Sequence, residues 1–335
     1  MRNWKTTKTL RLLFLTLPAM INLQSTGFCA TSVSANVAVP GPTAPIPAWI
    51  EQLSKQTGLN WYDIAAIHQY EFNIHKKNNS DQQTHIYIPD RWWSGLLNPH
   101  SDETNPGIIR VFGGIGQDAD GDGQALRTSR NDVTQSFFSY LAKNGTSEKK
   151  LEHTLLQFYE DPNIVTRIEE YREIFKHSNS TSLQSFVFPI PVKRDYSYKD
   201  TWGDGRSWGG RRIHEGTDIF APYGTPVLSV TYGYIESLGW NKYGGWRVGI
   251  RTVDNLYFYY AHLSGYAKGI KQGTVVKPGE VIGYVGSSGY GKIGTSGKFP
   301  PHLHFGMYKD TGKHEWAFDP YPNLRRWEQA VRKRR

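Results

Sequence analysis

The chain has 335 residues, and its 39 Lys and Arg against 30 Asp and Glu give a formal net charge of +9. The excess lies at the two ends, since residues 1–30 carry +4, residues 321–335 carry +5 and the segment between them is neutral. This distribution argues against a nucleic-acid-binding protein, which would carry basic residues across its folded surface, and a hydrophobic content of 38% excludes global disorder.

Residues 1–35 have the pattern of a secretory signal peptide. A basic stretch ends at Arg11, and the apolar residues 12–23 that follow are too few for a transmembrane helix, which needs about 20. Cleavage is expected after Ala35, which would remove Cys29, the only cysteine, and Ser25 with Gly27 offers a second site. An uncleaved anchor and a lipid on Cys29 are the alternatives. We therefore expect export across the cytoplasmic membrane, with membrane contact only through this signal segment.

A Pro-rich segment, residues 36–48, leads into a region of helical periodicity. Its four prolines favour an extended linker. In residues 49–178 apolar side chains recur every three to four positions, which predicts a helical domain. Its helices are expected to begin at Asn60, near Asn131, at Ser147 and at Pro162.

A polar segment at residues 177–182 marks the expected domain boundary. Beyond it 23 of the 34 glycines lie between residues 201 and 320, and short β-prone runs alternate with Gly and Pro. This pattern predicts a mainly antiparallel β domain over residues 183–327, followed by a basic tail at residues 328–335, so the fold class is α+β with two domains. The expected strands are Val227–Tyr232, Trp246–Thr252, Leu256–Ala261, Val281–Val285 and Leu303–Met307.

Three short segments of the β region contain histidines with the spacing of a metal site. His302 and His304 lie two residues apart, and His214 and Asp218 lie four apart, so each pair shares one face of an extended strand. His262 lies in the third segment. Nitrogen and carboxylate donors without thiolate are typical of zinc, and three protein ligands leave a fourth position for water. The surplus histidines could then serve as a general base and as a donor to a developing oxyanion.

These segments resemble the lysostaphin-type, LytM-like zinc endopeptidases that cut bacterial peptidoglycan. The resemblance covers residues 186–327 and rests on His214-x3-Asp218, Ala221–Val227, Tyr260–Leu263, Lys277–Gly283 and Pro301–Phe305. It implies that His214, Asp218 and His304 bind one zinc ion per chain and that His262 and His302 are catalytic. Which of the two catalytic histidines is the general base stays open.

Four further segments resemble the branch of this family that cuts the L-Ala–D-Glu bond of stem peptides during sporulation in bacilli. They are residues 200–203, 214–220, 244–251 and 286–291. The resemblance implies peptidoglycan as the partner, and the cell wall, the forespore intermembrane space or the cortex as the location; no oligomer is indicated. The alternatives are a cross-link endopeptidase of the vegetative wall and a non-catalytic wall-binding protein.

One position departs from the family pattern. Trp208 stands six residues before His214, where many members have a Tyr that stabilises the transition state. An indole N–H donates a hydrogen bond but accepts none. Arg211 and Arg212 lie close by, and their guanidinium groups could hold a carboxylate of a stem peptide, with a solvated edge as the alternative. We therefore expect Trp208, Arg211 and Arg212 to bind substrate.

The helical region carries two weaker signals. Residues 61–71 resemble the helix that delivers the acid of lysozyme-like transglycosylases, with Glu71 in the place of that acid. Residues 118–123 resemble the start of a calcium loop, but Ser129 stands where a bidentate Glu is expected. We expect a weakly lysozyme-like domain that targets the protein or holds glycan, with Glu71 as a second catalytic site as the alternative.

Overall fold

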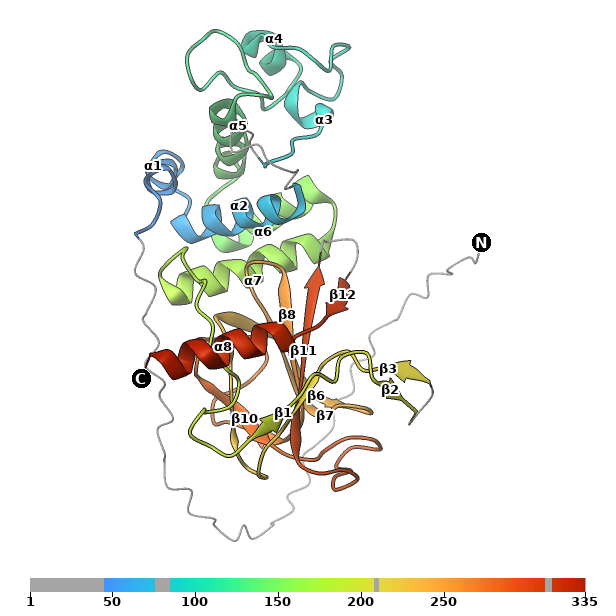
Figure 1. The fold of residues 1–335 in the computed structure, drawn as a ribbon. Coiled ribbons are helices and arrows are strands. Elements are labelled where there is room, and N and C mark those ends of the chain that lie inside the picture. The colour runs from blue at the N-terminus through green and yellow to red at the C-terminus, as the bar shows by residue number, and fades with distance from the viewer. Residues whose placement is uncertain (1–44, 76–84, 208–210, 311–314, 335) are drawn as a thin grey trace, which may run out of the picture. The chain divides into compact units, whose positions relative to one another are not determined.

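A computed structural model describes residues 45–75, 85–207, 211–310 and 315–334, which all belong to one compact unit. The predicted signal peptide, Cys29 and most of the predicted linker lie outside the described residues. Helices come first along the chain and strands follow, which confirms the α+β fold class (Figure 1). In the described part of the chain, every helix is too short or too polar to cross a bilayer.

The four predicted helix starts are confirmed, and side-chain caps are present at two of them. The Ser129 side chain accepts a hydrogen bond from the Asp132 backbone, and the Asp161 side chain caps the helix that Pro162 opens. The helical region consists of α1 (Ala48–Thr57), α2 (Trp61–His75), α3 (Asp90–Trp93), α4 (Pro106–Val111), α5 (Arg130–Lys143), α6 (Glu148–Tyr159) and α7 (Pro162–Ser178).

The β region is built on one antiparallel sheet. Among the described residues its main path runs β1-β4-β11-β8-β7-β6-β9, while β10 joins β5 to β8, β12 pairs with β11, and β2 pairs with β3 alone. The strands are β1 (Ser197–Tyr198), β2 (Gly205–Arg206), β3 (Arg212–Ile213), β4 (Thr217–Phe220), β5 (Pro226–Leu228), β6 (Gly233–Asn241), β7 (Gly245–Arg251), β8 (Leu256–Tyr266), β9 (Val275–Val276), β10 (Val281–Val285), β11 (His302–Asp310) and β12 (Glu315–Phe318).

Alternation along β8 and β11 separates a core face from an open face. Phe258 and Phe305 point to the core face, where the Trp327 ring of α8 (Tyr321–Lys333) lies 6.1 and 6.2 Å from theirs. Leu324 of the same helix is fully buried. Helix α8 therefore covers the core face of the sheet. The opposite face carries polar side chains that line a cleft, and it is called the open face below.

Two segments at the ends of the β region, residues 177–182 and α8, are part of the folded structure. The segment at residues 177–182 is an ordered turn in which Asn179 ends α7 in the left-handed conformation and Ser180 is buried. The predicted start of the basic tail, residue 328, falls inside α8. There Glu328 accepts hydrogen bonds of 2.6 Å from the Tyr196 and Tyr198 hydroxyls, so the helix is part of the folded β region.

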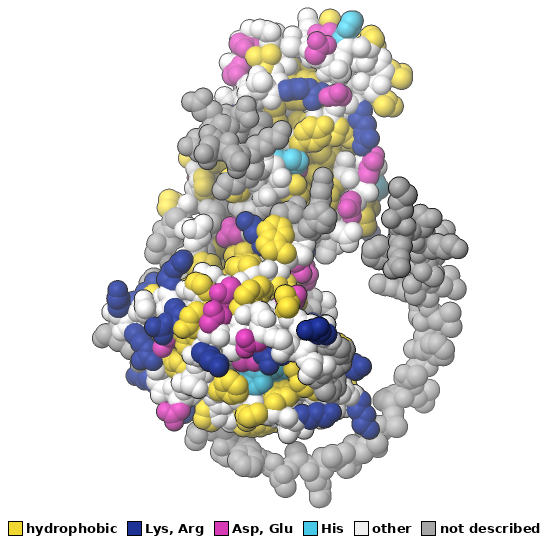
Figure 2. All heavy atoms as spheres, turned by 45° about the vertical axis from the view of Figure 1, so that its right-hand side comes forward, with side chains coloured by type: hydrophobic (Ala, Val, Ile, Leu, Met, Phe, Trp, Pro, Cys, Tyr) yellow, Lys and Arg dark blue, Asp and Glu magenta, His cyan; other side chains and the backbone are white. Residues whose placement is uncertain are grey.

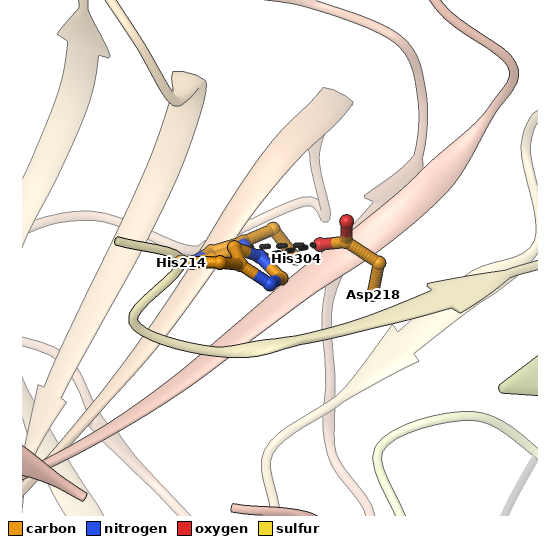
Figure 3. A group of neighbouring side chains, drawn as sticks. All are labelled: His214, Asp218 and His304. Carbon is orange, nitrogen blue, oxygen red and sulfur yellow. Dashed lines mark hydrogen bonds and ion pairs between the residues drawn. The ribbon is translucent and has the colours of Figure 1, made fainter. Parts of the chain in front are cut away.

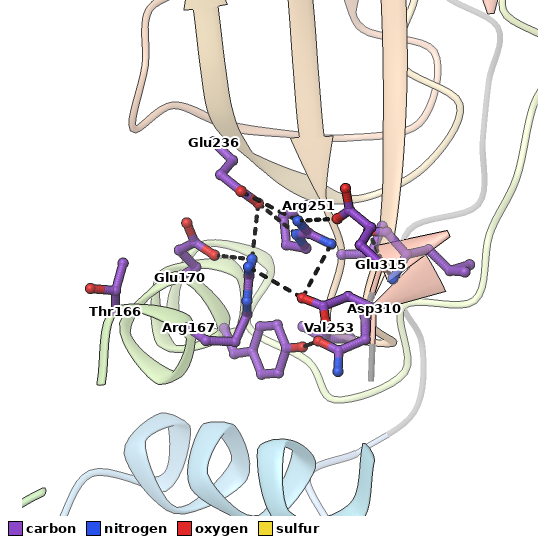
Figure 4. A network of polar contacts seen from close by, with 12 residues as sticks. Thr166, Arg167, Glu170, Glu236, Arg251, Val253, Asp310 and Glu315 are labelled. Carbon is purple, nitrogen blue, oxygen red and sulfur yellow. Dashed lines mark hydrogen bonds and ion pairs between the residues drawn. The ribbon is translucent and has the colours of Figure 1, made fainter. Parts of the chain in front are cut away.

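Helix α7 packs against the edge of the sheet through a partly buried ionic network (Figure 4). Arg251 of β7 is 3% exposed; it donates to Glu236 over 2.5 Å and to Glu315 over 3.0 Å. Arg167 of α7 donates to the same Glu236 carboxylate over 2.9 Å and lies 3.6 Å from Asp310. Because each arginine has an acidic partner on another element, the network ties the helical region to the strands.

Candidate active site

Three side chains with metal-binding atoms lie together on the open face of the sheet (Figure 3). His214 precedes β4, Asp218 lies on β4, and His304 lies on the neighbouring β11. His214 Nε2 is 2.9 Å from His304 Nδ1 and 3.0 Å from Asp218 Oδ1, and the last two atoms are 3.1 Å apart. Tetrahedral zinc ligands at about 2.0–2.1 Å from one ion lie about 3.3 Å from one another. The donor set and its spacing therefore fit zinc.

The register of the sheet brings these donors together. His304 stands directly opposite Asp218, and opposed residues of an antiparallel pair present their side chains on the same face. Gly216 lets the chain pass over His304, because a Cβ at this residue would lie 2.5 Å from His304 Cε1. A glycine is therefore required in the turn between His214 and Asp218.

Contacts behind the donors hold them in place. His214 Nδ1 lies 2.7 Å from the Thr201 carbonyl oxygen, which leaves Nε2 to present its lone pair to the site. Arg206 of β2 donates to Asp218 Oδ2 over 2.6 Å. Burial acts to raise the pKa of Asp218, but hydrogen bonds with His214 and His304 outweigh it and hold the pKa well below its ordinary value. The carboxylate is therefore ionised.

The other two predicted histidines lie beside this group. The His262 and His302 rings are 4.8 Å apart, and His302 Nε2 is 3.8 Å from Asp218 Oδ1. Each Nδ1 lies 2.8 Å from a backbone oxygen, that of Ser288 for His262 and that of Pro300 for His302. Burial lowers the pKa of both rings. Both imidazoles are therefore neutral at pH 7, with Nε2 ready to accept a proton.

His262 reaches the open face through an irregularity in β8. On a regular strand it would share the core face with Tyr260. Instead Ala261 and His262 together oppose the single Arg247 of β7, which is the pattern of a β-bulge. His262 takes a φ of 62°, which is uncommon for a residue with a Cβ, and Leu263 returns to the core. The bulge thus turns His262 toward His302.

The five predicted residues line one cleft with a volume of about 790 Å³. Figure 2 shows histidine side chains at the surface of the β region, beside hydrophobic and basic side chains. Arg212 also lines the cleft, whereas its neighbour Arg211 is exposed and is not among the lining residues. Trp208 lies outside the described residues. Aromatic side chains that complete the walls are Tyr243, Tyr257, Tyr259, Tyr290, Phe299 and Tyr308.

Two arginines of the cleft were missed by the sequence analysis. Arg206 lies in a two-residue strand twelve positions before Asp218, and Arg247 lies on β7 opposite the bulge. Neither stands next to a predicted histidine or aspartate of the site, and the resemblance in residues 244–251 did not single out Arg247. The alternation of Arg247, Gly249 and Arg251 on β7 could have indicated a polar face, but not which face holds the site.

Glu71 lies in a different environment from the histidines. It is 1% exposed at the C-terminal end of α2. Its carboxylate accepts hydrogen bonds from the Tyr159 hydroxyl over 2.5 Å and from the Tyr87 backbone over 3.0 Å, and it lies 2.9 Å from His75 Nδ1. These contacts are those of a structural carboxylate that joins α2, α6 and the segment before α3.

The acidic loop of the helical region is held by hydrogen bonds within itself. Asp118, Asp120 and Asp132 have carboxylate oxygens within 4.8 Å of one another. Asp118 accepts from two backbone N–H groups, and the Ser129 hydroxyl donates to Asp120 over 2.9 Å. Ser129, at the twelfth position of the calcium pattern, therefore serves here as a loop contact and helix cap.

Comparison with known proteins finds similarity to peptidases. Peptidase family M23 matches residues 212–320. An L-Ala–D-Glu endopeptidase of Bacillus subtilis strain 168 is 52% identical over 278 residues, which are 82% of this chain and 85% of that relative. Lysostaphin of Staphylococcus staphylolyticus is 38% identical over 115 residues, 34% of this chain and 22% of lysostaphin. A crystal structure of lytM, a candidate glycyl-glycine endopeptidase of Ruminococcus gnavus, covers 73% of this chain and 97% of its own at 29% identity, with a TM-score of 0.39.

Proposed function

Since this chain belongs to peptidase family M23 and is a peptidase, we propose that it is a zinc-dependent endopeptidase of peptidoglycan that cuts the L-Ala–D-Glu bond of stem peptides. The observation that carries the proposal is the group of His214, Asp218 and His304 in one cleft with His262 and His302. The proposed L-Ala–D-Glu specificity is supported by the similarity to the Bacillus subtilis endopeptidase named for that bond. The match covers 82% of this chain, which is long enough to include most of the helical region.

His214, Asp218 and His304 would hold the zinc ion, with Arg206 and the Thr201 carbonyl orienting two of them. Zinc bound there would polarise the scissile carbonyl and lower the pKa of a water molecule to about 7. The ionised Asp218 carboxylate compensates part of the positive charge.

The proton transfers fall to His262 and His302. Each ring is neutral with Nδ1 bound to a backbone oxygen, so its Nε2 can take the proton of the attacking water. The same Nε2 can then donate that proton to the leaving amine nitrogen. The other ring could donate a hydrogen bond from Nε2 to the oxyanion in its imidazolium form, which takes its second proton from solvent, because in the neutral ring Nδ1 carries the only N–H. We propose this division of roles without assigning either ring to one of them.

We also propose that the protein acts outside the cytoplasmic membrane, in the cell wall or the spore cortex. Residues 1–35 support export by their composition. The sporulation setting is supported by the resemblance in residues 200–203, 214–220, 244–251 and 286–291. The net charge of +5 in residues 321–335 is compatible with an anionic wall polymer as a partner.

Digestion of purified muropeptides tests this function directly. We expect the zinc-loaded protein to release the stem peptide after L-Ala, so that mass spectrometry finds glycan carrying a single L-Ala. A chelator should abolish the product and added zinc should restore it. A mass change from cutting a cross-link would favour the vegetative-wall alternative, and binding without any product would favour the non-catalytic one. Cleavage that persists in chelator contradicts the zinc mechanism.

Replacing Arg206 tests how Asp218 is held. Arg206→Gln should weaken zinc binding about 10- to 100-fold, because it removes the charge-assisted hydrogen bond that orients Asp218 Oδ2. Competition with a chromogenic chelator measures the affinity. Arg326→Gln removes the same charge from an exposed position on α8 and serves as the control. Equal affinities of the two variants would contradict the orienting role.

A further inference from the structure

The cleft extends beyond the histidine group across β6, β7 and β8, and three arginines line it. Arg206 is committed to Asp218. Arg212 and Arg247 form no ion pair with any carboxylate in the described ranges, although Glu215 also lines the cleft. The Nε atom of each is buried and has no hydrogen-bond partner in the structure. Two positive groups thus lie in the cleft without a matching acid.

Both guanidinium groups are held by neighbouring side chains. Arg212 lies over the rings of Tyr243 and Tyr290, at 4.8 and 5.9 Å from their centroids. Arg247 donates to the Ser237 hydroxyl over 2.5 Å. The groups that hold these two side chains are aromatic rings and a hydroxyl. None of these groups is a carboxylate, so the contacts do not neutralise the positive charges of the guanidinium groups.

The two arginines and the histidine group line the same cleft. The Tyr290 ring, over which Arg212 lies, is 5.9 Å from the His262 ring. Arg247 stands across the strand pair from the bulge that carries His262. Arg212 stands two residues before His214. The pair therefore flanks the histidine group.

We propose that Arg212 and Arg247 form a carboxylate-binding subsite that reads the substrate residue next to the scissile amide. The inference rests on the proposed function. In a stem peptide the D-Glu residue continues through its side-chain carboxyl, so its α-carboxylate is free and is attached to the carbon that bears the scissile nitrogen. Guanidinium groups bind carboxylates through charge-assisted, often bidentate hydrogen bonds. The subsite thus selects stem peptides with this free carboxylate over those in which it is an amide.

Two synthetic peptides that differ in one group test the subsite. One has the free α-carboxylate on D-Glu, and the other has an α-carboxamide in its place. We expect the zinc-loaded wild-type protein to prefer the carboxylate peptide roughly 10- to 100-fold in kcat/KM, since the amide leaves two buried charges unpaired. Arg212→Gln and Arg247→Gln should lose most of this preference through a higher KM for the carboxylate peptide.

Three measurements make the result decisive. Zinc content and thermal unfolding should match the wild type in both variants, and cleavage of the carboxamide peptide should fall by less than cleavage of the carboxylate peptide. Arg326→Gln, on the exposed side of α8, should keep the full preference. Equal cleavage of both peptides by the wild type, or an equal loss of both in the variants, overturns the subsite while leaving the peptidase function intact. Cleavage of neither peptide by the zinc-loaded wild type overturns the proposed function itself.

Discussion

Replacing His304 with alanine (His304→Ala) is expected to abolish both zinc binding and peptide hydrolysis. Its Nδ1 lies 2.9 and 3.1 Å from the other two donor atoms, so no remaining side chain of the group can take its place. With two donors left, the affinity for zinc should fall below what the protein can retain in dialysis. We expect hydrolysis of muropeptides to fall by about three orders of magnitude or more.

His302→Ala is the informative comparison for that variant. His302 lies outside the donor set but in the same cleft, so this variant should keep one zinc ion per chain and still lose hydrolysis. His100→Ala, at an exposed position of the helical region, should change neither quantity. Metal analysis measures the zinc content of the three variants, and product chromatography measures their hydrolysis. Together they distinguish a zinc ligand, whose loss removes both, from a proton carrier, whose loss removes hydrolysis alone. Retained zinc in His304→Ala would contradict the assignment of the donors.

Replacing the buried Arg251 should lower the free energy of unfolding more than replacing an exposed charged residue does. Arg251→Met keeps much of the side-chain volume but leaves Glu236 and Glu315 without their shared partner. Removing one partner of a buried ion pair costs about 3–5 kcal/mol. Because both carboxylates are partly exposed to solvent, at 29% and 42%, we expect a smaller loss of about 2–4 kcal/mol in the free energy of unfolding.

Urea unfolding followed by circular dichroism measures this loss. Lys176→Met is a matched control, because it removes a cation whose ion pair with Glu148 is exposed on both sides. It should change the free energy of unfolding by about 1 kcal/mol at most. If Arg251→Met behaves like this control, the ion pairs of Arg251 with Glu236 and Glu315 do not stabilise the protein.

Local patterns predicted the elements whose signals are local. Periodicity and capping residues located α5, α6 and α7, and β10 matches the predicted strand Val281–Val285. The strand β6 was not predicted, because Gly233 and Gly239 interrupt its sequence and it lacks a run of β-branched residues. It is stabilised instead by its pairing with β7, the next strand along the chain, and with β9, which lies further along.

The sequence by itself indicated which side chains form the site. Strand alternation predicted that His302 and His304 share one face, and that His214 and Asp218 do so too, because residues two or four positions apart point the same way. The division into metal ligands and proton carriers was implied by the family resemblance, and the similarity to known peptidases shows the family itself.

Only the tertiary structure decided which further residues complete the site. A bulge turned His262 out of the core, β2 brought Arg206 to Asp218, and β7 placed Arg247 beside the histidines. It also buried Glu71 among three partners. Each of these outcomes depends on register and packing between segments far apart in the chain, and such pairings leave no periodicity in the sequence of either segment.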